Sequence, residues 1–105
     1  MITVLVTYKL PEAMNRAAAH ALSEQVAPRF QVLEGLRMKH FLYQEEQGFG
    51  GGFYTWDTRE AADTFHTETW LDSMEERMGS RPELQYFETA VVVDNNSGKI
   101  WLEAA

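Results

Sequence analysis

The chain has 105 residues, 45% of them hydrophobic and 24% charged, and its 16 acidic and 9 basic residues give a formal net charge of −7. This length fits one domain, which we expect to span residues 1–105, and the acidity argues against nucleic acid or an anionic membrane as a partner, since both select basic surfaces. The chain has no cysteine, which excludes disulfides, thiolate metal sites and iron–sulfur clusters.

Hydropathy and the N-terminal residues bear on the location of the protein. No apolar run approaches the roughly 20 residues that a membrane-spanning helix needs. The first ten residues, MITVLVTYKL, lack the basic start and the small-residue cleavage site of a signal peptide. We therefore expect a cytoplasmic protein that does not bind membranes.

The first third of the chain predicts a strand and then a helix. Residues 2–10 alternate in the β-branched pattern of a strand. Pro11 stands where a helix would begin, a position that tolerates its missing N–H. An alanine-rich stripe at helical spacing then runs to Phe30. We expect Pro28 to kink this helix or to end it one turn early.

The middle of the chain predicts a β-hairpin and a broken helix. Residues 36–44 and 52–56 have strand patterns on either side of a glycine-containing turn. Asp57 is a suitable N-cap for the helix that follows. The apolar residues of that helix change sides along its length, so we expect a break near Trp70 and an end near Gly79.

The C-terminal part predicts one long strand, residues 84–94, then a turn at 95–98 and a short strand at 99–103. The resulting order, β-α-β-β-α-β, is that of a ferredoxin-like α+β fold: a four-stranded antiparallel sheet with its helices on one face. The strands are nevertheless apolar on both faces, whereas a sheet with one face in water alternates cleanly with polar residues. Because this chain has no third layer, we expect a homodimer in which two sheets pack face to face.

A set of spaced residues runs through the middle of the chain: Gly35-Leu36-x-x-Lys39, Glu45, Gly51-Gly52-x-Tyr54-x-Trp56, Ala62 and Phe65. This motif resembles the YdhR-like monooxygenase family of the dimeric α+β barrel superfamily. The resemblance implies two ferredoxin-like chains that pair their sheets into one barrel. Related superfamily members oxygenate polycyclic phenols without metal or flavin, isomerise small lactones, cyclise polyketides or degrade haem.

The glycines at 50–52 open the third predicted strand and are followed by three aromatic residues, Phe53, Tyr54 and Trp56. Glycines without side chains would let a helix, a partner chain or a planar ligand approach the backbone of the sheet. The alternative is a glycine-rich hairpin with a bulge. In both cases we expect the aromatic residues to take part in core and barrel packing.

Motifs for common cofactors are missing from the sequence. The three histidines do not have metal-binding spacing, and no glycine-rich phosphate loop is present, so we expect neither a metal nor another cofactor. Aromatic residues and histidines remain as candidates for chemistry. We expect His66, His40 and Tyr54 to be catalytic, and the substrate-binding residues to be Trp70, Trp56, Tyr43, Tyr86 and Phe65.

These candidates suit a small aromatic substrate. A histidine that titrates near neutral pH could deprotonate a phenol or hydroquinone, and a tyrosine could stabilise the oxyanion. We expect Arg37 and Lys39 to extend from the second strand to the rim of the pocket. The leading hypothesis is a cofactor-independent oxygenase. A proton-transfer enzyme, such as a cyclase or isomerase, and a non-catalytic binding or haem-related dimer remain alternatives.

Overall fold

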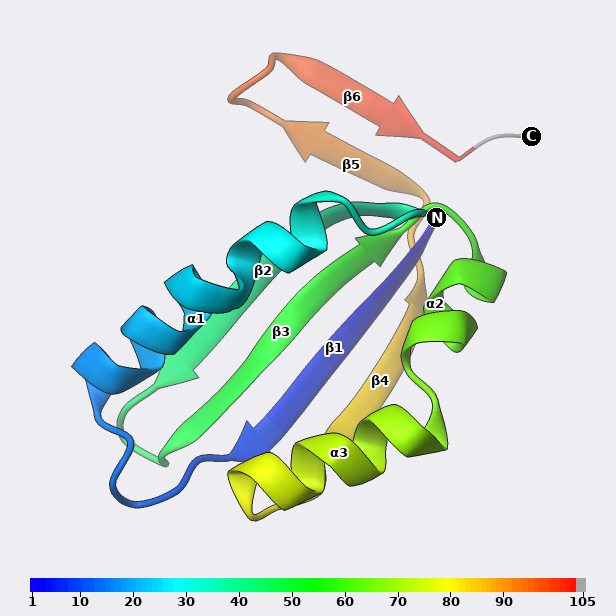
Figure 1. Ribbon diagram of the computed structural model, residues 1–105. Coiled ribbons are helices and arrows are strands. Elements are labelled where there is room, and N and C mark those ends of the chain that lie inside the picture. The colour runs from blue at the N-terminus through cyan, green and yellow to red at the C-terminus, as the bar shows by residue number, and fades with distance from the viewer. Residues whose placement is uncertain (104–105) are drawn as a thin grey trace.

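A computed structural model describes residues 1–103 as a four-stranded antiparallel sheet, three helices and a separate hairpin (Figure 1). Strand order in the sheet is β2-β3-β1-β4, and β5 pairs only with β6. This arrangement confirms the predicted ferredoxin-like α+β fold; the last two residues of the predicted domain lie outside the described part. The elements are β1 (Ile2–Lys9), α1 (Arg16–Gln31), β2 (Leu36–Gln44), β3 (Phe49–Trp56), α2 (Arg59–Phe65), α3 (Glu68–Met78), β4 (Glu83–Glu88), β5 (Val91–Asp94) and β6 (Lys99–Leu102).

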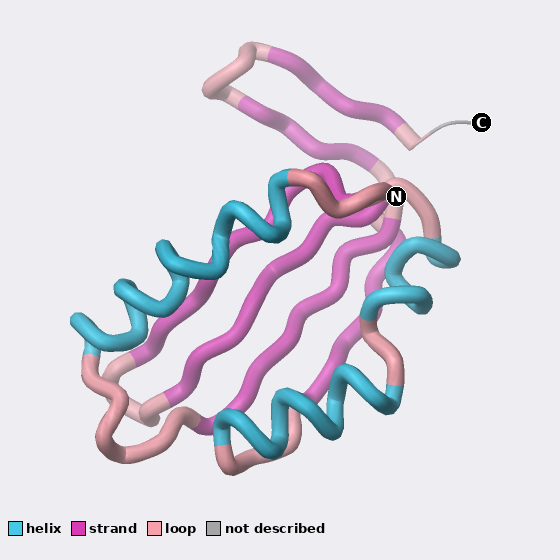
Figure 2. Tube along the Cα trace, in the orientation of Figure 1, coloured by secondary structure: helices cyan, strands magenta, loops and turns pink. Residues whose placement is uncertain are grey.

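All three helices lie on the same face of the sheet (Figure 2). We call this face the inner face and the opposite one the outer face. Since residues paired across antiparallel strands share a face, the register places Val4, Tyr54 and Lys39 in one row of the inner face. The next row consists of Val6, Gly52 and Phe41. The outer face carries Met38, His40, Leu42, Phe53 and Phe87.

The hydrophobic core lies between the inner face and the helices. Its buried residues are Val4, Val6, Tyr54, Trp56 and Ala62. Trp56 is the largest of the fully buried side chains, at 1% exposure. The aromatic residues after the glycines therefore divide between the two faces: Tyr54 and Trp56 are in the core, whereas Phe53 on the outer face is 38% exposed.

Helix α1 begins later than Pro11 predicts and ends later than Pro28 predicts. Pro11 starts a turn, and the helix begins only after Asn15, whose side chain caps it by accepting a hydrogen bond from the Ala18 backbone N–H at 2.9 Å. An asparagine cap satisfies a free helix donor, which Pro11 cannot do. Pro28 lies inside the helix, which continues to Gln31, so the predicted early end is wrong.

The second helical region breaks at His66–Thr67, three to four residues before the predicted position near Trp70. The Thr67 hydroxyl accepts a hydrogen bond from the Trp70 backbone N–H at 3.1 Å and so starts α3. The N-cap of α2 is Thr58 rather than Asp57, whose carboxylate instead pairs with Arg37. The predicted end at Gly79 is confirmed, because this glycine takes a left-handed conformation with φ of 82°.

The long strand predicted at 84–94 is two strands. Glu88 pairs with Ile2, the first residue of β1, so β4 has no neighbouring strand beyond this point. The chain leaves the sheet at Thr89–Ala90, and β5 then forms a hairpin with β6. This hairpin extends past the end of the sheet near the N-terminus (Figure 1).

Candidate functional site

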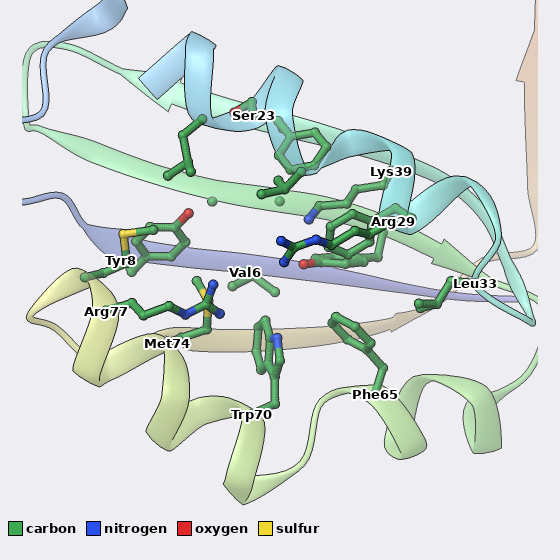
Figure 3. Close-up of a pocket in the computed structure, with 18 residues that line it drawn as sticks. Val6, Tyr8, Ser23, Arg29, Leu33, Lys39, Phe65, Trp70, Met74 and Arg77 are labelled. Atoms are coloured by element: carbon green, nitrogen blue, oxygen red, sulfur yellow. The ribbon is translucent and has the colours of Figure 1, made fainter. Parts of the chain in front are cut away.

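A cavity of about 320 Å³ lies between the helices and the inner face of the sheet. Helix α1 forms one side with Leu22, Val26 and Phe30, and α3 forms the other with Trp70 and Met74. Figure 3 shows side chains from both helices and from the sheet converging on this space. A mostly apolar cavity with a few polar groups is typical of a site for a small organic molecule.

A glycine makes room for the cavity at the floor. Gly52 lies between Val6 and Phe41 in the register and lines the cavity. A Cβ at this position would lie 2.8 Å from Cε1 of Tyr54 and 3.2 Å from Cε of Lys39. The missing side chain therefore lets these two residues lie over the sheet.

The rim position that the sequence predicts for Lys39 is wrong, because this residue lies inside the cavity. Its Nζ is 3.4 Å from the ring centre of Phe30, 3.9 Å from that of Phe41 and 4.6 Å from that of Tyr54. No carboxylate pairs with this amine among residues 1–103, and burial lowers the pKa of Lys39 to about 7. A cavity amine that titrates near neutral pH is a candidate acid or base.

Two tyrosine hydroxyl groups share the cavity with Lys39. Burial raises the pKa of Tyr54, and the neighbouring Tyr8 raises it further. Burial also raises the pKa of Tyr8, although the positive charge of Arg77 partly opposes this shift. Both phenols therefore keep their protons at neutral pH, and either can donate a hydrogen bond to an oxygen of a bound molecule.

His66 lies behind the cavity wall in a cluster of aromatic rings. Its Nε2 accepts a hydrogen bond from Nε1 of Trp56 at 3.2 Å, which leaves the proton of the neutral ring on Nδ1. Its ring centre is 4.7 Å from that of Tyr54 and 4.8 Å from that of Trp70. Burial lowers the pKa of His66 to about 4, with a further lowering by the charge of Lys39 that Asp63 partly offsets.

The predicted site residues fall into three groups. Tyr54, Phe65 and Trp70 line the cavity. His66, Trp56 and Tyr86 form the adjoining aromatic cluster, in which the ring centres of His66 and Tyr86 are 6.3 Å apart. The structure does not bring the remaining two to the cavity lining: Tyr43 packs edge-on against His20 of α1, and His40 is exposed on the outer face.

Sequence reasoning missed the cationic side chains of the cavity, which are Lys39, Arg29 and Arg77. For Lys39 the signal was available, because it alternates in step with Phe41 and not with His40. Arg29 and Arg77 carry no comparable signal in the sequence. They reach the cavity only because α1 and α3 pack on the same face of the sheet (Figure 3).

Two further observations limit what the described residues can form. None of the helices in residues 1–103 combines the length and the hydropathy that a bilayer crossing requires. In the same part of the chain, no three histidine, aspartate or glutamate side chains come together as a metal ion would need.

The fold is similar to that of several solved oxygenases. A Deinococcus radiodurans protein assigned provisionally as an antibiotic biosynthesis monooxygenase aligns with a TM-score of 0.66 and 13% identity, over 90% of this chain and 97% of its own. The cofactor-independent oxygenase SnoaB of Streptomyces nogalater aligns with a TM-score of 0.60 and 14% identity, over 84% and 91%. A Streptomyces coelicolor monooxygenase solved with nanaomycin D aligns with a TM-score of 0.58 and 12% identity, over 87% of this chain and 90% of its own.

At these identities the likeness is one of fold. The sequence matches no protein-family model and no curated protein. The three similar structures therefore support the α+β fold of this chain, and the narrower resemblance to the YdhR-like family stays a prediction.

Proposed function

We propose that the protein is a cofactor-independent monooxygenase that uses dioxygen to oxidise a small phenolic or hydroquinone-like molecule bound in the helix–sheet cavity. The observation that carries this proposal is the Lys39 amine, which lies among aromatic rings in a cavity of substrate size. The solved structures of similar fold support the proposal, since one of them is a cofactor-independent oxygenase.

Lys39 suits the role of general base better than the two predicted histidines. At its pKa of about 7, roughly half of the amine is neutral at pH 7 and can take a proton. Nε2 of His66 already accepts the Trp56 N–H, and His40 lies on the outer face. We therefore assign the role of general base to Lys39. We propose that His66 and Trp56 stabilise the position of Tyr54 through their packing.

In an anthrone-type substrate, the reacting group is a CH₂ between two aromatic rings. Lys39 takes one proton from this group, and the resulting phenolate-like anion transfers electrons to dioxygen and forms a C–O bond. The peroxide takes the proton back from Lys39. Its O–O bond then breaks as the carbon loses its second hydrogen, so that CH₂ and O₂ give C=O and H₂O.

Two cavity groups stabilise the anion in this scheme. After the proton transfer, the Lys39 ammonium lies near the negative charge that it created. Tyr54 keeps its own proton, because burial raises its pKa, and can donate a hydrogen bond to the phenolate oxygen. In a cavity with a mostly apolar lining, such donors stabilise a developing charge more strongly than they would in bulk solvent.

Oxygen uptake with a panel of anthrones and naphthols tests the proposal. We expect wild-type protein to consume oxygen with at least one of them, and Lys39→Met to lower kcat by a factor of roughly 10²–10⁴, the usual contribution of a general base. Lys9→Met is the matched control, since Lys9 is exposed at the end of β1 and does not line the cavity. No uptake with any compound, or equal rates in wild type and Lys39→Met, would contradict the proposal.

A proton-transfer reaction on a polyketide or lactone substrate is the second candidate. Lys39 and Tyr54 support this candidate too, because an amine base and a protonated phenol beside each other can move a proton without any oxidant. The two functions differ in their need for oxygen. Turnover that persists under strict anaerobiosis would select the isomerase or cyclase, and turnover that stops would select the monooxygenase.

We also propose that the protein is a homodimer, joined through the outer face of the sheet. Phe53 and Phe87 on this face are 38% and 51% exposed, and Val93 of the hairpin is 64% exposed. Monomeric proteins rarely leave a large continuous apolar patch in water. Sedimentation at micromolar concentration should therefore give twice the mass of one chain, and a stable monomer would refute the dimer.

A further inference from the structure

The arginines of this chain divide into two sets. The four that lie away from the cavity form ion pairs with carboxylates: Arg16 with Glu45, Arg37 with Asp57, Arg59 with Asp63, and Arg81 with Glu68, Asp72 and Glu75. Arg29 and Arg77 form no ion pair with any side chain of residues 1–103, and both line the cavity. In an acidic protein with a carboxylate available to each of its other arginines, this exception is informative.

The two unpaired arginines come from opposite sides of the cavity. Arg29 extends from α1 and Arg77 from α3, and both side chains lead toward the space between the helices (Figure 3). Among residues 1–103, the only side-chain hydrogen bond of either arginine is from Nη2 of Arg77 to Sδ of Met74, at 3.0 Å. A thioether is a weak acceptor, so most of the guanidinium donors stay available.

In the described part of the chain, the cavity lining also contains no acidic side chain, although it contains Lys39 in addition to the two arginines. The cavity is thus locally cationic within a chain of net charge −7. Clefts lined by charge of one sign concentrate ligands of the opposite sign. Arginine in particular binds carboxylates through two parallel N–H donors.

We propose that the molecule bound in this cavity is an aromatic carboxylic acid, whose carboxylate lies between Arg29 and Arg77 and whose ring lies on the apolar wall beside Lys39. The aromatic ring of the ligand in this inference rests on the proposed function. The carboxylate narrows the substrate class to aromatic acids. The exposed arginines hold the carboxylate at the mouth, where water can still reach it. The apolar walls of Phe30, Phe65 and Trp70 take the ring.

Binding of a matched pair of probes tests the acid site without relying on turnover. The probes are 6-hydroxy-2-naphthoate and its neutral amide, 6-hydroxy-2-naphthamide, measured by titration calorimetry at pH 8 and low salt. We expect wild-type protein to bind the acid about tenfold more tightly than the amide, which corresponds to about 1.4 kcal/mol. The preference should shrink as salt is added, because the arginines are exposed.

Variants assign the preference to the two arginines. Arg29→Gln and Arg77→Gln should each lower the affinity for the acid several-fold and leave that for the amide within about twofold. Arg16→Gln is the control on α1, because Arg16 pairs with Glu45 and does not line the cavity. Circular dichroism of each variant checks that it folds.

The outcomes separate this inference from the proposed function. Equal affinity of wild type for acid and amide, or an equal loss in Arg16→Gln and Arg29→Gln, would overturn the acid site. Acid preference without oxygen uptake would support the acid site while the oxygenase fails. Oxygen uptake with neutral naphthols and no preference for acids would overturn the acid site and leave the oxygenase in place.

Discussion

Both faces of the sheet carry large apolar side chains, but the surroundings of these side chains differ. On the inner face the helices cover Val4, Tyr54 and Trp56, which are at most 3% exposed. On the outer face Phe53 and Phe87 remain in contact with water in the single chain. The pattern of apolar residues in a strand therefore indicates which side chains can be buried. Whether they are buried depends on the packing of helices or of a second chain against that face.

The same comparison separates the candidate chemistry from the candidate interface. The cavity, its amine and its two free arginines all lie between the helices and the inner face. The outer face contributes one ionisable candidate, His40, which is exposed and 5.8 Å from the ring centre of Phe53. We assign catalysis to the inner face and assembly to the outer face.

The largest expected difference between the faces is in folding stability. Trp56→Ala removes a fully buried ring and should lower the free energy of unfolding by about 3–5 kcal/mol. Phe53→Ala, on the outer face, should cost about 1 kcal/mol when urea unfolding is measured at a concentration where the chain is monomeric. Equal losses for the two variants would contradict the assignment of the core to the inner face.

Acid sensitivity should also separate the faces. The pKa of His66 is about 4 in the folded chain against 6.5 for the free side chain, so below pH 6.5 the unfolded state binds more protons. Its contribution is complete above pH 6.5 and is lost as the pH falls through 4, an effect of roughly 3 kcal/mol. His66→Gln should flatten this limb in urea melts between pH 4 and 7.

His40→Gln is the matched control for that experiment, because His40 is an exposed histidine on the outer face. At a concentration where the chain is monomeric, it should leave the acid limb of stability as steep as in wild type. If His40→Gln flattens the limb and His66→Gln does not, the burial of His66 in the aromatic cluster is not the source of the acid sensitivity.

An added charge should disrupt the outer face selectively. Phe87→Glu places a carboxylate among apolar residues and should weaken dimer formation at least tenfold, or about 1.4 kcal/mol. Val32→Glu introduces the same charge at a residue that is 85% exposed after α1, away from this face, and should not change the dimer. Sedimentation equilibrium of the two variants measures the difference, and equal association would contradict an interface on the outer face.

Much of the fold could be predicted because its signals are local. The alternation in residues 36–44 gave the bounds of β2, and Gly79 ended α3 because a left-handed conformation favours glycine. Predictions failed where two local signals competed. Pro11 is compatible with a helix start, but the Asn15 side chain supplies a hydrogen bond, and the helix begins there.

The site could be predicted only in part, because alternation does not say which face the helices cover. His40 and Lys39 are neighbours in β2 and point to opposite faces. The prediction that His40 lies in the packed face implies that Lys39 lies at the rim. In the structure Lys39 lies in the cavity and His40 is exposed. Arg29 and Arg77 depend on how two helices sit on one sheet, which is a long-range property of the fold.

The smallest expected effect is at the cavity floor, where two glycine substitutions can be compared. Gly52→Ala places a methyl group against Tyr54 and Lys39, so we expect a loss of about 1 kcal/mol in stability and a several-fold weaker binding of naphthol-type ligands. Gly48→Ala costs a similar amount of stability, since its φ of 69° is unfavourable for alanine, but it meets no neighbouring atom and does not line the cavity. Calorimetric titration should thus show weaker binding in Gly52→Ala alone. Equal affinity in both variants would mean that the ligand does not lie over the Gly52 floor.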